Sequence, residues 1–468
     1  MTTHLSAQSV SLLHGWFPVT VQVIAAAILV LALGWRSRRW SLRWLPIALL
    51  VGVGAALFLY WYVGYQGWSG QPAPWGLWIW IALTAIAGVV LLAGWRNTRL
   101  WQRGVSVLAI PLCMLSAALV LNLWVGYVST TAAAWNLLTG APLGGQIDAK
   151  TFRKMRDTGE MPINGTVMAV TIPDDASGFK HRDELVYLPP AWYATNPPPA
   201  LPVVMMIGGE FGHPADWPSV GAQKVLDDFA ASHGGNGPVV VWVDHSGAFA
   251  NDTECVNGTR GNAADHLTKD VIPYMVHNFG VSPDPAHWGI VGWSAGGTCA
   301  LMLTVKHPEL FTAFVDLDGQ MGPNAGTQQQ TLQRLFGGDA QAWAAFNPKM
   351  VMADHGTYHG ISAWFGVSEP ATAVYRAGAA NPGDVQLPPE PETTDKGELV
   401  AVAQYLCALS SSLGIECAVV PQPGKHDFPS AVNVFASALP WLAGKLGTPG
   451  APVIPLPGAP TTTSQGSR

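Results

Sequence analysis

Hydrophobic residues are concentrated near the beginning of the chain, in four stretches that are apolar on every helical face. They lie near Phe17–Trp35, Trp44–Val63, Trp75–Trp95 and Val105–Val128. Each approaches or exceeds the ~20 residues that span the hydrocarbon core of a bilayer. Tryptophans and tyrosines crowd their ends, where aromatic rings sit at the level of the lipid headgroups. Because a helix on the surface of a soluble domain keeps a polar face, the pattern predicts four transmembrane helices within residues 1–128.

The arginines between these stretches predict their orientation. The first connecting loop carries Arg36, Arg38, Arg39 and Arg43, and the third carries Arg96, Arg99 and Arg103. The N-terminal tail, the second loop (Gly64–Pro74) and the stretch from 129 to 149 carry no Lys or Arg. Positively charged loops stay in the cytoplasm, so we expect both termini to lie outside it. The spans contain no charged residue, which disfavours a transporter with an accessory domain.

Beyond residue 165 the apolar runs are short and alternate with helical patterns. Strands are expected at Thr166–Ile172, Glu184–Leu188, Pro202–Ile207, Pro238–Val243, Trp288–Val291, Phe311–Asp316, Ile361–Gly366 and Ile415–Val420. Helices are expected at Gly221–Ser232, His266–Phe279 and about Thr298–Lys306. Later strands that are apolar throughout, alternating with helices, indicate an α/β domain with a mainly parallel sheet covered on both faces.

This alternation sets the expected domain boundaries. Residues 129–165 form a linker with one weak helical run around Phe152–Arg156, and residues 166–446 form the outer α/β domain. Residues 447–468, rich in Pro, Thr and Ser, are expected to be a disordered tail.

Composition narrows the possible partners. Charged residues make up 12% of the chain and the net charge is −6, with no long basic run. Nucleic-acid binding is therefore disfavoured. The low charge content instead fits a membrane segment attached to a soluble domain, so the expected partner is a lipid bilayer.

Four of the five cysteines lie in the outer domain, which faces an oxidising compartment in this topology. They are Cys255, Cys299, Cys407 and Cys417, whereas Cys113 lies in the fourth span. Four cysteines allow three connectivities. We favour Cys407–Cys417, a helix and the following strand, together with Cys255–Cys299. Buried free thiols remain an alternative.

The main chemical signal is Gly292-Trp293-Ser294-Ala295-Gly296, which follows an apolar strand and precedes a helix. Small residues around Ser294 permit a sharp turn that holds the serine in a strained conformation and exposes its hydroxyl. A Gly-x-Ser-x-Gly motif in this context predicts a nucleophile elbow. Ser294 is therefore the candidate nucleophile.

A serine nucleophile needs a base, and the base needs an orienting acid. His426, just past the last expected strand, is the candidate base. Glu369 follows the strand Ile361–Gly366, where hydrolases of this plan place the acid, and it is our first choice. Asp318, after the preceding strand, and Asp395, in a Pro/Glu-rich loop, are the alternatives.

The oxyanion formed during acyl transfer needs backbone donors. The N–H of Ala295 is one candidate. The second is expected from the loop Gly208–Gly212, with Glu210 as the first choice and Phe211 as the next.

Metal binding and cofactors are not predicted. His355 and His359 have i, i+4 spacing, but no acidic or cysteine partner completes a zinc site with them. We therefore expect neither a metal ion nor another cofactor.

Three segments resemble the putative-esterase family of α/β-hydrolases: Tyr187-Leu-Pro-Pro-Ala-Trp-Tyr, Gly292-Trp-Ser-Ala-Gly-Gly-Thr-Cys-Ala and Gly424-Lys-His-Asp-Phe. This family includes S-formylglutathione hydrolase, feruloyl and siderophore esterases, and mycolyltransferases. The resemblance covers roughly Thr166–Leu446 and implies an α/β-hydrolase fold, with Ser294 as nucleophile, His426 as base and Glu369 as acid. Gly208 departs from the family, because many esterases have His before the oxyanion-hole glycine.

The leading interpretation is a membrane-anchored, extracytoplasmic serine esterase that forms an acyl-enzyme and acts on an ester or acyl-lipid substrate. An acyltransferase, similar to the mycolyltransferases, would instead move the acyl group to a sugar or lipid hydroxyl. A third interpretation is a non-catalytic hydrolase-fold domain that binds a component of the cell envelope. The presence of candidates for serine, histidine and acid favours the enzyme.

Overall fold

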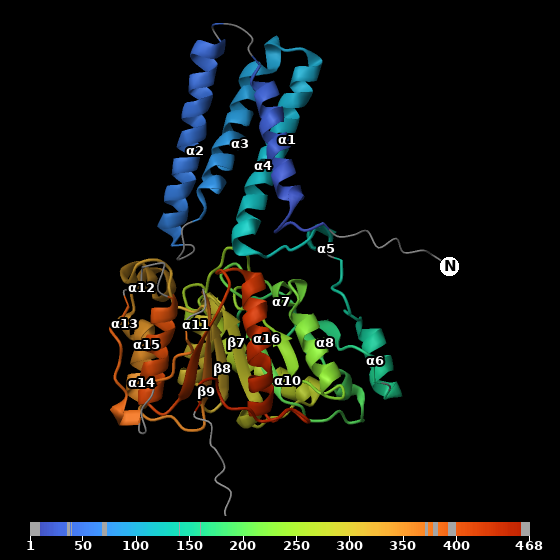
Figure 1. The fold of residues 1–468 in the computed structure, drawn as a ribbon, viewed down its shortest axis with the longest axis vertical. Helices are drawn as coiled ribbons and strands as arrows, with labels where there is room; N and C mark the ends of the chain where they lie inside the picture. Colours follow the sequence, from blue (N-terminus) through green and yellow to red (C-terminus); the bar gives the residue numbers. More distant parts are fainter. Residues whose placement is uncertain are drawn as a thin grey trace, which may run out of the picture. The chain divides into compact units, whose positions relative to one another are not determined.

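The computed structural model describes residues 10–34, 38, 40–67, 73–139, 141–159, 161–369, 373–377, 382–391 and 399–459. The chain divides into two compact units, Met1–Ala141 and Pro142–Arg468 (Figure 1).

The first unit contains four helices long and apolar enough to cross a membrane. They are α1 (Trp16–Leu33), α2 (Leu45–Gln66), α3 (Trp75–Gly94) and α4 (Leu100–Val125), with the short π-helix η1 (Trp40–Trp44) leading into α2 and the short helix α5 (Thr131–Thr139) at the end of the unit. The mean hydropathy of the four spans is 2.0 to 2.3. The four expected apolar helices are therefore present. The fourth begins before its expected start at Val105.

Close packing within this unit depends on small residues. A side chain added at Gly52 of α2 would place its Cβ 2.7 Å from the backbone oxygen of Ala82 in α3. The missing side chain lets the two helices approach closely, as at many helix contacts within membranes. Ala25, Ala87 and Ala109 are likewise fully buried between helices.

The second unit is built on one sheet of eight strands in the order β1-β2-β4-β3-β7-β8-β9-β10. The strands are β1 (Thr166–Val170), β2 (Glu184–Leu188), β3 (Val203–Ile207), β4 (Val239–Trp242), β7 (Trp288–Trp293), β8 (Ala313–Leu317), β9 (Ser362–Ser368) and β10 (Glu416–Gln422). β2 runs antiparallel to β1 and to β4, and the other neighbours are parallel. All eight predicted strands are present, which confirms the α/β class.

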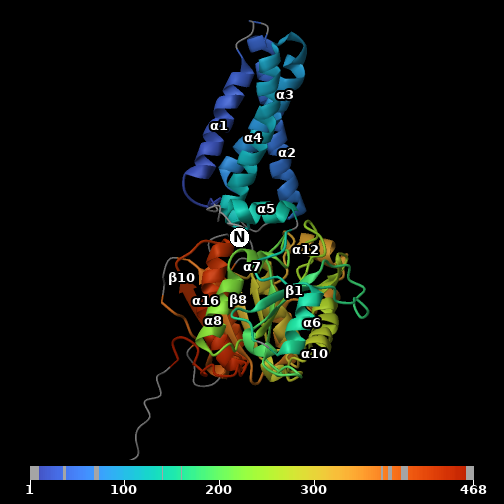
Figure 2. The same cartoon turned by 90° about the vertical axis from the view of Figure 1, so that its right-hand side faces the viewer.

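Helices cover both faces of this sheet (Figures 1 and 2). The main ones are α6 (Ala149–Thr158), α8 (Ala222–Ser232), α10 (Ile272–Phe279), α11 (Ala295–Lys306), α12 (Gln328–Phe336), α14 (Pro348–His355), α15 (Leu399–Ser412) and α16 (Phe428–Lys445). Asp316 of β8 lies beside Gly297 of α11, whereas Gly366 of β9 lies against Val434 of α16. Asp316 pairs with Phe365, so these two residues face the same side of the sheet, and Gly366, the next residue, faces the other side. The two contacts therefore lie on opposite faces. α11 and α16 therefore enclose the centre of the sheet.

The segment expected as a linker contributes to the core of the second unit. Asp148 caps α6 by accepting a hydrogen bond from the Thr151 backbone N–H. Phe152 of this helix is buried, and its ring stacks on Trp192 with centroids 5.5 Å apart. At the other end, Leu456 of the expected tail is also buried, and residues 460–468 lie outside the described residues.

Both favoured disulfides are present. Cys255 is bonded to Cys299 of α11, and Cys407 of α15 to Cys417 of β10. The Cα atoms are 5.7 Å apart in each pair. Cys113 is a buried free thiol in α4.

Candidate active site

Ser294 occupies the sharp turn between β7 and α11, with a φ of 57°. Neighbouring glycines make this turn possible, since a Cβ at Gly292 would lie 1.8 Å from the backbone oxygen of Gly296. The Ser294 N–H donates to the carbonyl of Leu317 in β8 at 2.8 Å. The sheet thus holds the serine in a conformation that non-glycine residues rarely adopt.

His426 lies in the loop between β10 and α16. Its Nε2 is 3.0 Å from Ser294 Oγ, although 132 residues separate the two in the chain. Asp427 beside it caps α16 by accepting from the Ser430 N–H, and Ser430 Oγ accepts from the Lys425 N–H. These bonds fix the residues before and after His426 in the chain. The ring also lies 5.3 Å from that of Trp293.

The carboxylate beside His426 belongs to Asp318, directly after β8. Asp318 Oδ2 is 3.7 Å from His426 Nδ1, and Asp318 Oδ1 accepts from the Ser368 N–H at 2.7 Å. Asp318 has a φ of 54°, and only 3% of its surface is exposed. Burial raises the pKa of Asp318, while the charge of His426 and the hydrogen bond from Ser368 oppose that shift.

Glu369, the first choice for this position, has a different environment. It follows β9 and is half-buried. Burial and the nearby charge of Asp318 both raise its pKa. Among the described residues the ion pair of His426 is with Asp318, and none joins the histidine to Glu369. The third option, Asp395, lies outside the described residues.

The contact between His426 Nδ1 and Asp318 Oδ2 is longer than a hydrogen bond. Neither His426 Nδ1 nor Asp318 Oδ2 makes a hydrogen bond in the described part of the chain, and both atoms are buried. At 3.7 Å they are slightly too far apart for one. Catalytic hydrogen bonds are often long without substrate and tighten in the reacting complex.

The loop Gly208–Gly212, which follows β3, lies against Ser294. A Cβ at Gly209 would be 3.5 Å from Ser294 Cβ and 3.0 Å from the Trp293 ring. The Gly212 N–H donates to the Gly209 carbonyl, so Glu210 and Phe211 form the tip of a tight turn. Phe211 has a φ of 65°. The loop that was expected to supply the second oxyanion donor is therefore next to Ser294, as is Ala295, the first residue of α11.

An ion pair with a buried carboxylate, which the sequence did not reveal, supports this loop. The Arg182 guanidinium donates to both Asp244 carboxylate oxygens, at 2.9 and 2.6 Å, and to the Gly212 carbonyl at 2.7 Å. Asp244 is fully buried. Burial alone would raise the pKa of Asp244, but the hydrogen bonds and charge of Arg182 outweigh that effect and lower it. Arg182 thus ties the end of β4 to the loop Gly208–Gly212, called the oxyanion loop below for its expected role.

Arg182→Ala is expected to destabilise the second unit by about 3 kcal/mol, because it leaves the Asp244 charge buried without its partner. The measurement is the free energy of unfolding of the detergent-solubilised chain in urea. Lys224→Ala is the matched control, since the Lys224–Asp228 ion pair is exposed and should contribute less than about 1 kcal/mol. Equal effects of the two substitutions would contradict the structural role of Arg182.

The chain is similar to known proteins. A family model described as "Putative esterase" matches residues 180–359. An uncharacterized protein of Corynebacterium glutamicum is 31% identical over 357 residues, which cover 74% of this chain and 82% of that protein.

Similar solved structures include a ferulic acid esterase, with 14% identity, a TM-score of 0.46 and coverage of 60% of this chain and 99% of the other. An S-formylglutathione hydrolase from Agrobacterium tumefaciens has 17% identity, a TM-score of 0.45 and coverage of 61% and 97%. The protein MPT51 (FbpC1) of Mycobacterium tuberculosis has 17% identity, a TM-score of 0.39 and coverage of 59% and 97%.

Proposed function

Because this chain belongs to the putative-esterase family and is a serine hydrolase, we propose that it is a membrane-anchored esterase using a Ser294–His426–Asp318 triad. The observation that carries the proposal is the 3.0 Å contact between Ser294 Oγ and His426 Nε2 at a strained strand-to-helix turn. A serine in such a turn beside a partly buried imidazole is arranged to attack a carbonyl carbon.

The proposed reaction begins when Ser294 Oγ attacks the ester carbonyl and His426 Nε2 accepts the hydroxyl proton. The negative charge on the carbonyl oxygen is stabilised by the N–H of Ala295 and a second N–H from the loop, that of Glu210. His426 then gives its proton to the departing alcohol, which leaves an acyl group on Ser294. Water or another hydroxyl, activated by His426 in the same way, releases the acyl group.

Asp318 replaces Glu369 as the proposed acid. The acid must face Nδ1 of the histidine, to select the tautomer with its lone pair on Nε2 and to stabilise the imidazolium. Asp318 Oδ2 is the carboxylate oxygen within ion-pair distance of that nitrogen. Its other oxygen is held by the Ser368 N–H, so the carboxylate has a fixed direction.

Membrane anchoring is proposed from the four apolar helices, and an extracytoplasmic active site from the arginine-rich first and third loops. The two disulfides fit the same side of the membrane, because disulfides persist in oxidising compartments. An ester close to a membrane surface, including an acyl lipid, is the proposed substrate class. The acceptor is water in an esterase and a sugar or lipid hydroxyl in an acyltransferase.

A fluorophosphonate probe tests the enzymatic proposal on the full-length chain in membranes. The probe phosphonylates only an activated serine, so mass spectrometry of the labelled peptide should place the adduct on Ser294. His426→Ala should slow the labelling strongly, whereas His307→Ala, at a half-buried histidine paired with Glu309, should leave it unchanged. An unlabelled but folded protein would refute the esterase and favour a non-catalytic binding domain.

The pH dependence should reflect a base that is active well into the acidic range. Burial lowers the pKa of His426, and the nearby charges of Asp318 and Asp427 only partly reverse the shift. His426 must be neutral to accept a proton, so activity is lost as the pH falls through its pKa. The acidic limb of kcat/KM for a short-chain ester should therefore have its midpoint below pH 6.5, the ordinary pKa of the side chain. A midpoint above that value would contradict this environment.

A further inference from the structure

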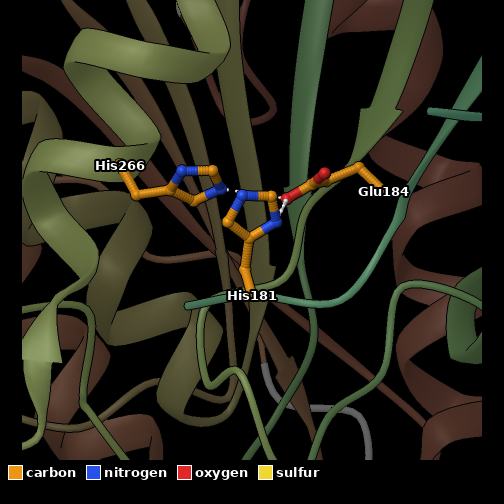
Figure 3. A group of neighbouring side chains, drawn as sticks. All are labelled: His181, Glu184 and His266. Carbon is orange, nitrogen blue, oxygen red and sulfur yellow. Dashed lines mark hydrogen bonds and ion pairs between the residues drawn. The ribbon is translucent and has the colours of Figure 1, made fainter. Parts of the chain in front are cut away.

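Away from the nucleophile, three side chains of the second unit converge on one carboxylate oxygen (Figure 3). His181 Nδ1 and His266 Nε2 each lie 2.9 Å from Glu184 Oε1. Figure 3 shows the two imidazole rings on one side of the carboxylate, with both interactions ending on it. His266 and Glu184 are fully buried, and only 5% of the His181 side chain is exposed. The potential ligand atoms all lie within 4.8 Å of one another.

The His266 ring of this cluster lies between two carboxylates, those of Glu184 and Asp270. His266 Nδ1 faces Asp270 Oδ2 at 3.4 Å, and Asp270 is itself buried. When Nδ1–H of a neutral His266 points to Asp270, the lone pair of Nε2 points to the Glu184 carboxylate. Two lone pairs in contact repel unless a proton or a cation lies between them. A carboxylate behind a metal-binding histidine is a common arrangement that fixes the tautomer.

Glu184 also has an unused ligand atom. Its Oε2 is buried and has no hydrogen-bond partner in the described part of the chain. A buried carboxylate oxygen without a partner is costly. The ion pairs of Glu184 among the described residues are with the two histidines, and the nearby Arg182 is engaged by Asp244. The buried charges of Glu184 and Asp270 are therefore balanced only by protons on imidazoles or by a bound cation.

We propose that His181, Glu184 and His266 bind one divalent transition-metal ion, with Zn²⁺ as the preferred occupant. Two imidazoles and one carboxylate form a ligand set that suits zinc and excludes calcium and magnesium, which prefer oxygen ligands. Tetrahedral zinc with bonds of about 2.0–2.1 Å separates its ligands by about 3.4 Å. The present 2.9 Å separations thus need to open by a few tenths of an ångström. Glu184 Oε2 or a water molecule completes the coordination.

Binding also requires a small rotation of the imidazoles. Their centroids are 4.1 Å apart and their planes are inclined by 24°. A metal ion must lie near the plane of each ring, so the rings must turn apart as the ion enters. The rotation must also move His181 Nδ1 away from the Arg182 carbonyl oxygen, which lies 2.9 Å from it.

The position of the site gives the metal a role in the proposed reaction. His181 precedes Arg182, whose guanidinium holds the Gly212 carbonyl of the oxyanion loop. Glu184 begins β2, and His266 begins the π-helix η4 (His266–Val271). The ion would join these elements and fix the backbone that carries Arg182. This role rests on the proposed function, whereas metal binding itself does not. The three ligands are positioning residues, remote from the reacting atoms.

The test measures how much zinc the purified chain binds. The full-length chain is purified in detergent, treated with chelator, loaded with ZnCl₂ and dialysed, and its zinc is measured by mass spectrometry. We expect about one zinc per chain in the wild type. Glu184→Gln and His266→Ala should weaken zinc binding at least about tenfold. His307→Ala is the matched control, because it removes an exposed histidine–glutamate pair and should keep the full zinc content.

A wild-type chain that is folded but binds no zinc would overturn the proposal, as would unchanged binding in both ligand variants. If the variants do not fold, X-ray absorption of the zinc-loaded wild type decides: nitrogen and oxygen ligands with at least two imidazoles support the site, and sulfur ligands overturn it. Fluorophosphonate labelling of the same samples separates the two proposals. Labelling of Ser294 without zinc binding would refute the metal site and leave the esterase intact.

Discussion

Ser294→Ala is expected to reduce kcat/KM for a short-chain ester by about 10⁶-fold, the loss typical of removing a triad nucleophile. Without Oγ no acyl-enzyme forms, and only the oxyanion hole and substrate binding remain. His426→Ala should lose nearly as much, because an unassisted serine hydroxyl is a weak nucleophile at neutral pH. The measurement is steady-state hydrolysis by the purified full-length chain.

The double variant Ser294→Ala/His426→Ala distinguishes a triad from two independent residues. Groups that act as one unit are strongly non-additive, so the double variant should be no slower than the slower single variant. Ser437→Ala, at an exposed serine of α16, is the control and should retain activity within about twofold of the wild type. Independent, multiplicative losses would contradict the proposed mechanism.

Asp318→Asn is expected to lower kcat by about 10⁴-fold with little change in KM. An amide in place of the carboxylate favours the wrong tautomer of His426 and no longer stabilises the imidazolium. Glu369→Gln makes the same chemical change at the acid that was our first choice from sequence. It should leave kcat within a few-fold of the wild type, because no described ion pair joins Glu369 to His426.

Steady-state kinetics of these two isosteric variants decides the identity of the acid. A large loss in Glu369→Gln together with a small one in Asp318→Asn would restore the first interpretation of the sequence. Comparable losses in both would indicate that the two carboxylates share the role. The near-ultraviolet circular dichroism of each variant must match that of the wild type, so that a loss of fold is not read as a loss of catalysis.

The sequence was sufficient for the strands and for the sharp turn at Ser294 because their signals are local. β3 and β4 are buried apolar runs, and the Gly-x-Ser-x-Gly motif lies between β7 and α11. The ends of elements were less well defined. α11 begins at Ala295, directly after Ser294, rather than near Thr298.

The sequence could not separate Asp318 from Glu369 as the candidate acid, for a geometric reason. β8 and β9 are parallel neighbours, so Asp318 and Glu369 emerge at the same edge of the sheet. Chain order does not indicate which of them faces His426. The positive φ of Asp318 contributes to its placement, and Asp followed by Gly319 is a weak sequence signal for that backbone conformation.

Contacts between polar side chains far apart in the chain could not be predicted from the sequence. Arg182 and Asp244 are separated by 62 residues, and Glu184 and His266 by 82. Neither pair belongs to a periodic run or a short motif. Only the folding of β2, β4 and η4 against one another brings these side chains together.

The burial of α11 has an electrical consequence at Ser294. Every residue from Ala295 to Val305 is buried, and the first turn of the helix carries no acidic side chain. Aligned peptide dipoles give a helix about +0.5 elementary charge at its N-terminus. Because the helix is buried, solvent screens that charge less than it would at an exposed helix end. We therefore expect the interaction of this helix end with an anion at Ser294 to depend only weakly on ionic strength.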